Sequence, residues 1–285
     1  MFIVLAACLG GCTPISLGFL DPAGPTASGQ RVLFFWIVGL ALVVVLPVLI
    51  ITPWLLWRYR YGQDTAPYRP RWEYSLPMEI LTWGVPVLVV VVLGVLTWQR
   101  THQLDPYHPL TGNTPPLEIQ VIAMDWRWLF IYPDQGVATL NQLAIPKGRS
   151  VHLSLTSASV MQSLLIPRLS GQIYAMAGMH TQQYLQADAV GTFTGRNTQF
   201  NGAGFQKQAF EVRSLTPQAF EGWLASARRS PLSLDCDRYR ELARRQSTEG
   251  PSLYRDAPAG LFASVIAASQ KNALPSCSDL HGPSQ

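Results

Sequence analysis

The chain has 285 residues, of which 48% are hydrophobic and only 13% are charged. Soluble proteins average roughly 25% charged residues, so the composition excludes a disordered chain and argues against an ordinary soluble enzyme. The net charge of +4 is too small and too scattered for a nucleic-acid-binding protein, so no nucleic-acid partner is expected. The four cysteines form no C-x-x-C pair, which excludes a zinc ribbon or a thioredoxin motif.

The N-terminus, MFIVLAACLGGC, is an apolar stretch that ends in small residues and cysteine. This pattern predicts a lipoprotein signal over residues 1–12, lipidated at Cys12 or alternatively at Cys8. Two incidental cysteines in a hydrophobic leader are the other interpretation. A secretory signal opens with positive charge, but no Lys or Arg precedes Arg31, so we expect a signal truncated at its start. Residues 13–31 would then form a periplasmic tether.

Two uncharged runs predict transmembrane helices over residues 32–57 and 80–99. At 1.5 Å per residue they reach roughly 39 and 30 Å, against a hydrocarbon core of about 30 Å. Buried core helices are the alternative, but such helices rarely run this long without a polar stripe. The loop over residues 58–79 is basic, which places it in the cytoplasm and both termini outside; its arginines are Arg58, Arg60, Arg69 and Arg71.

Beyond Arg100 the pattern changes to period-two alternation, broken by Gly, Pro and Asp. It predicts short strands and an antiparallel sandwich over residues 112–216. Thr216 and Pro217 are typical of a helix start, so residues 217–285 are expected to form a helical C-terminal tail with a solvated, charged surface. Cys236 and Cys277 lie in this tail and could form a disulfide outside the cytoplasm, although nothing in the sequence shows that they meet.

Several motifs occur in a fixed order between about Cys12 and Arg213. They include residues 20–22 (LDP), 79–86 (EILTWGVP), 124–133 (MDWRWLFIYP), 172–179 (QIYAMAGM) and 202–205 (GAGF). Together they resemble subunit II of the haem–copper oxidases, and within that family the cytochrome-bo-type ubiquinol oxidase branch. The resemblance implies a two-helix transmembrane hairpin, an exported all-β cupredoxin-like sandwich and a short helical tail, in a bacterial inner membrane with the N-terminus and the C-terminal domain in the periplasm.

The resemblance also implies a function and partners. This chain would be a subunit of a proton-translocating quinol oxidase, with structural and assembly roles and no redox centre. Quinol would be oxidised, and oxygen reduced to water, on haems and copper held by subunit I. Subunits III and IV and membrane lipid would be the other partners.

The copper chemistry of the family separates its branches. Cytochrome c oxidase subunit II holds a two-copper centre, which needs two thiolates from C-x-x-x-C together with histidine and methionine ligands, a soft set suited to copper. Here Gly204 stands about where the first thiolate would be, and Gln162 takes the place of the upstream histidine. No cysteine occurs between Cys12 and Cys236. The resemblance therefore implies no metal and no cofactor in this chain.

Two other functions stay open. One is a cytochrome c oxidase subunit II whose donor docks without the copper centre. The other is a membrane-tethered cupredoxin-like copper-binding protein, whose ligands would be His152, Met176, Met179 and His180, although we interpret these side chains as packing or surface residues.

Three further side chains gain roles from the resemblance. Glu79 matches a glutamate at the entrance of a proton-uptake channel into the large subunit; an ordinary carboxylate favoured by a helix N-terminus is the alternative. Trp126 and Trp128, two apart on a predicted strand, would share one face and pack against the large subunit.

Overall fold

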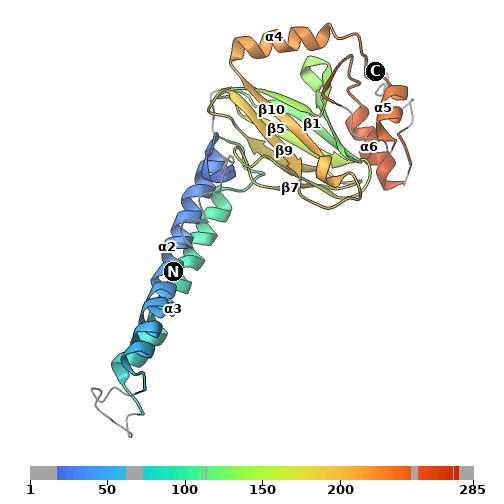
Figure 1. Ribbon diagram of the computed structural model, residues 1–285. Coiled ribbons are helices and arrows are strands. Elements are labelled where there is room, and N and C mark those ends of the chain that lie inside the picture. The colour runs from blue at the N-terminus through green and yellow to red at the C-terminus, as the bar shows by residue number, and fades with distance from the viewer. Residues whose placement is uncertain are drawn as a thin grey trace. The chain divides into compact units, whose positions relative to one another are not determined.

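The computed structural model describes residues 18–61, 73–110, 112, 114–244, 250–271 and 273–275. Cys8, Cys12, Arg69, Arg71 and Cys277 therefore lie outside the described residues. The chain divides into two compact units, one made of residues Met1–Gly29 and Pro106–Gln285 and the other of residues Gln30–Asp105. Figure 1 shows the long helices of the second unit and the β-sandwich of the first.

Two long apolar helices, α2 (Pro25–Arg58) and α3 (Leu76–Gln103), contain the predicted spans. Both are long and apolar enough to cross a membrane. Each extends past its predicted start, and in each a proline stands in the first turn, where its missing N–H costs nothing. Three internal prolines do not end the helices; they are Pro47, Pro53 and Pro86.

Residues 18–24, predicted as part of a tether, are docked on the sandwich. They open with a 3-10 turn, η1 (Gly18–Leu20). The Asp21 carboxylate lies 2.8 Å from an Arg168 guanidinium nitrogen, and the Arg168 Nε donates to the Asp21 backbone oxygen. The backbone of Ala23 donates to Arg168 and accepts from Asp188, both at 2.7 Å. A Cβ on Gly24 would lie 2.2 Å from a backbone oxygen of the sandwich, so the close approach requires glycine.

The sandwich consists of two sheets. The first has the strand order β11-β3-β2-β1-β5-β8, and its strands are β1 (Leu117–Met124), β2 (Arg127–Tyr132), β3 (Val137–Leu140), β5 (Val151–Ser157), β8 (Thr181–Leu185) and β11 (Ser252–Arg255). The second has the order β4-β10-β9-β6-β7, with β4 (Gln142–Pro146), β6 (Gln162–Leu165), β7 (Ile173–Ala175), β9 (Gly191–Asn197) and β10 (Ala209–Leu215).

The sandwich is not wholly antiparallel, as the alternation had suggested. β1 pairs with β5, and β4 with β10, in parallel. A parallel pair needs a crossover connection, and here β4 supplies one, because it lies in the second sheet between two strands of the first. Sequence alternation reports which face a residue occupies, but not the direction of its neighbouring strand.

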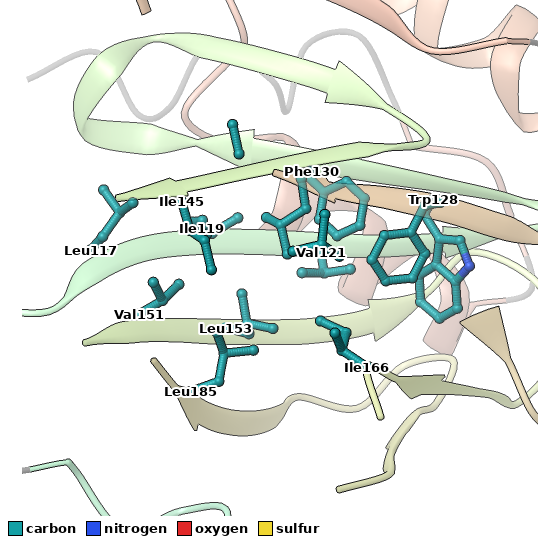
Figure 2. Close-up of a cluster of buried hydrophobic side chains, with 14 of the residues drawn as sticks. Leu117, Ile119, Val121, Trp128, Phe130, Ile145, Val151, Leu153, Ile166 and Leu185 are labelled. Atoms are coloured by element: carbon teal, nitrogen blue, oxygen red, sulfur yellow. The ribbon is translucent and has the colours of Figure 1, made fainter. Parts of the chain in front are cut away.

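The core lies between the sheets, where side chains from both inner faces meet (Figure 2). Val151, Leu153 and Leu155 point inward, as predicted. Tyr132 joins the two sheets, because its hydroxyl donates to the backbone oxygen of Ala144 and accepts from the Ala144 N–H, both at 2.9 Å. Burial raises the pKa of Tyr132 above its ordinary value, so the phenol stays protonated and keeps its donor.

The C-terminal tail begins as predicted. In α4 (Pro217–Arg228) the Thr216 hydroxyl accepts from the backbone of the first turn, and Phe220, Trp223 and Leu224 are buried against the core. The rest of the tail is helical as predicted in α5 (Cys236–Ala243) and α6 (Leu261–Gln270). It also contributes an unpredicted strand, β11, which pairs with β3.

Helices α5 and α6 pack on the outer face of the first sheet and form a second hydrophobic cluster with it (Figure 1). Tyr239, Leu242 and Phe262 are among the buried side chains. Arg127 is fully buried on β2 and donates to the Leu242 backbone oxygen at 3.1 Å, where a helix C-terminus favours a cation. The tail is therefore a third layer and not only a solvated surface.

Cys236 is the first residue of α5 and is disulfide-bonded. Its predicted pairing with Cys277 stays a prediction, because Cys277 lies outside the described residues.

Candidate functional site

Four carboxamide side chains lie together where the resemblance places the copper centre, and we call them the buried amide cluster: Gln162, Asn197, Asn201 and Gln208. Each is 7% exposed or less. Gln162 is the first residue of β6 and Asn197 the last of β9. Asn201 and Gln208 come from the segment between β9 and β10, which contains the short turn η3 (Phe205–Lys207).

Gln208 is the centre of this cluster. Its Nε2 donates to the Oε1 of Gln162. Its Oε1 accepts from the Nδ2 of Asn197 at 2.9 Å and from the Nδ2 of Asn201 at 2.7 Å. Gln162 extends this hydrogen-bond network to β1, because its Nε2 donates to the Met124 backbone oxygen at 3.0 Å. The cluster therefore links the end of β1 with β6, β9 and the segment before β10.

The chemistry of these groups does not fit a two-copper centre. Carboxamides are neutral, and buried polar groups must satisfy one another. Both polar atoms of Gln162 and Gln208 are already engaged by protein groups. Within the described parts of the chain, no group of three or more His, Cys, Asp or Glu side chains is placed to hold a metal ion.

The space beside Gly204, the position of the first thiolate in the resemblance, is not empty. The indole ring of Trp126 fills it. A Cβ on Gly204 would lie 2.1 Å from the Cδ2 of Trp126. Trp126 stands in the turn between β1 and β2, with a left-handed φ of 63°. Any larger residue at position 204 would displace this ring.

The same turn corrects the prediction for the two tryptophans. Trp126 is not on a strand, so it does not share a strand face with Trp128. Trp128 is fully buried on β2, with its ring centroid 5.6 Å from that of Phe210. It has no surface to offer a partner, and a subunit-packing role stays a prediction for Trp126 alone, which is half-buried.

The two histidines of the alternative copper site, His152 and His180, make other contacts in the structure. The His152 Nδ1 lies 2.6 Å from a Glu118 carboxylate oxygen, and its Nε2 lies 3.3 Å from the Gln182 side-chain oxygen. His180 meets the ring of Phe262 edge-on. Burial and the nearby charge of His152 lower the pKa of His180. Both ring nitrogens of His152 thus have protein partners, which leaves this set one imidazole short.

Glu79 lies in the first turn of α3 and belongs to the second compact unit, which does not contain the sandwich. Its side chain is exposed in this chain. The Trp83 indole N–H, one turn later, donates to the Glu79 Oε2 at 3.1 Å. An apolar groove of about 560 Å³ follows the same part of the helix, and Ile80, Gly84 and Leu88 are among its lining residues.

Comparison with known proteins identifies close relatives. The chain is 38% identical to the cytochrome bo(3) ubiquinol oxidase subunit 2 of Pseudomonas aeruginosa over 261 residues, which cover 92% of this chain and 78% of the relative. It is 40% identical to the protein of the same name from Pseudomonas putida, covering 90% and 81%. It is also 40% identical to the ubiquinol oxidase subunit 2 of Acetobacter aceti, covering 92% and 85%.

Comparisons with protein-family models and with solved structures are less informative. A scan against protein-family models finds no match. Among solved structures, the periplasmic domain of subunit II of cytochrome oxidase from Bradyrhizobium japonicum is similar with a TM-score of 0.40 and 19% identity, over 42% of this chain and 98% of that domain.

Replacement of Gln208 by Leu tests the buried amide cluster. The variant leaves the amides of Gln162, Asn197 and Asn201 without their common partner, so we expect the free energy of unfolding to fall by about 1–3 kcal/mol. Chemical unfolding of the full chain in detergent, followed by tryptophan fluorescence, measures it. Gln218→Leu, at an exposed position of α4, is the matched control, and equal losses in the two variants would contradict the account.

Proposed function

This chain belongs to the ubiquinol oxidase subunit 2 family, and from that premise we propose that it serves the oxidase without a redox centre of its own. Quinol is then oxidised, and oxygen reduced to water, on haems and copper held by the partner subunit I. The buried amide cluster carries this proposal, because neutral, mutually bonded carboxamides occupy the place where a copper-bearing relative needs thiolate and imidazole ligands.

The work of such a subunit is structural. We propose that α2 and α3 span the bacterial inner membrane and brace the large subunit, and that the cupredoxin-like sandwich caps its periplasmic face, with subunits III and IV also in the complex. Arg58, the last residue of α2, and Arg60 just after it support a cytoplasmic loop. A lipid on Cys12, or alternatively on Cys8, would hold the N-terminus at the outer leaflet.

The choice of electron donor tests this function. The complex that contains this chain, purified in detergent, should consume oxygen with a quinol as the donor. It should not do so with reduced cytochrome c, because no centre in this chain receives an electron from a protein donor. Oxygen consumption driven by reduced cytochrome c, in a preparation whose subunits have been identified, would overturn the proposal.

We further propose that Glu79 forms part of a proton-uptake entrance to subunit I, which makes this chain a non-redox but proton-handling part of the enzyme. Its carboxylate stands in the first turn of an apolar helix, and ionisable residues in membrane-spanning segments commonly mark proton pathways. The predicted topology puts this end of α3 on the cytoplasmic side, from which the protons are taken.

Glu79→Gln in the whole complex removes the titrating group and keeps its size. Positioned proton-transfer groups typically contribute 10²–10⁴-fold, so we expect oxidase turnover and proton uptake to fall by roughly tenfold or more. Both are measured on complex reconstituted in vesicles. The control is Glu73→Gln, an exposed carboxylate just before the helix, which should behave as the unchanged protein does. Unaltered turnover and uptake in Glu79→Gln would exclude the entrance.

A further inference from the structure

The contact between Trp83 and Glu79 has a fixed direction. An indole N–H is only a donor and a carboxylate is only an acceptor, so the 3.1 Å contact runs from the Trp83 Nε1 to the Glu79 Oε2. The two residues are four apart on one helix, where side chains are neighbours. Among the described residues, Trp83 is the only one whose side chain hydrogen-bonds this carboxylate.

We infer that Trp83 is a positioning residue for proton entry at Glu79. The inference rests on the proposed function of Glu79 and adds the group that holds its carboxylate in place. The indole occupies one carboxylate oxygen and leaves the other, Oε1, to take up and release a proton. Because an indole nitrogen does not accept a proton, Trp83 positions the carboxylate and takes no part in the relay itself.

The surroundings explain why this bond matters. The next row of residues on α3, which includes Ile80, Gly84 and Leu88, lines the apolar groove. Their side chains offer no hydrogen-bond donor to a carboxylate that turns toward them. Trp83 itself is 69% exposed in this chain, and its amphipathic ring suits the membrane interface. One residue thus anchors the start of the helix and orients the carboxylate.

The test is a double-mutant cycle in the assembled complex, with Trp83→Phe, Glu79→Gln and the double variant. Phenylalanine keeps an aromatic ring but removes the donor together with part of the bulk of the indole, a loss of bulk that the control below shares. Trp98→Phe is the matched control, because Trp98 stands near the other end of α3 and its ring contacts His102. Turnover per haem, the KM for quinol and proton uptake in vesicles are measured for each variant. Expressing turnover per haem corrects the rates for any variant that assembles less complex.

We expect Trp83→Phe to lower kcat and proton uptake about two- to tenfold, the range of one hydrogen bond, with the KM for quinol unchanged. Trp98→Phe should leave all three values as they are. The double variant should match Glu79→Gln alone, because the indole acts only through that carboxylate.

The other outcomes are distinguishable. If Glu79→Gln lowers turnover while Trp83→Phe does not, or if the two losses multiply in the double variant, the positioning role is wrong and the proton entrance stands. A rise in KM without a change in kcat also overturns the positioning role. If Glu79→Gln has no effect, the entrance and the positioning role both fail.

Discussion

The hydrogen bond between the side chains of Gln208 and Gln162 holds together one end of the sandwich. Through it the segment before β10 is joined to β6, and through Gln162 to the end of β1. In a copper-bearing relative, metal–ligand bonds would join the corresponding segments. Here neutral amides do so, and Trp126 packs against Gly204 beside them. The domain therefore has a cupredoxin-like architecture with a packed amide cluster at this end, and the proposal that it carries no redox centre rests on that cluster.

Separate contacts bind the rest of the first unit to the sandwich. Residues 18–24 are fixed by the Asp21–Arg168 ion pair and by backbone hydrogen bonds on either side of it. The tail is fixed by Arg127 and by the second hydrophobic cluster. A subunit that braces and caps its partners, as we propose for this chain, needs a rigid body, and these contacts are consistent with that role.

Much of the fold was predictable, because apolar length and period-two alternation report directly on burial. The two helices, the sandwich and the start of α4 at Thr216 and Pro217 follow from these signals. The parallel pairs, β11 and the buried faces of α5 and α6 do not, since strand neighbours and tail packing depend on contacts far apart in sequence.

For the candidate site, the absence of the thiolates and the position of Gln162 could be read from the sequence. The C-x-x-x-C spacing from Gly204 reaches Gln208, so its position could have been read in the same way. Its partners Asn197 and Asn201 could not, because exposed and buried amides look alike in sequence. Trp126 was misplaced because a left-handed turn at a tryptophan is rare.

The central claim is that mutually bonded amides have taken the place of a metal centre. The copper content of the full chain tests it most directly. The chain is produced in copper-supplemented cells, purified in detergent, treated with a chelator to remove loosely held metal, and analysed for copper per polypeptide together with its visible and paramagnetic spectra. The account predicts copper far below one ion per chain and no spectrum of a mixed-valence pair. Tightly held copper at or above one ion per chain, with that spectrum, would contradict it.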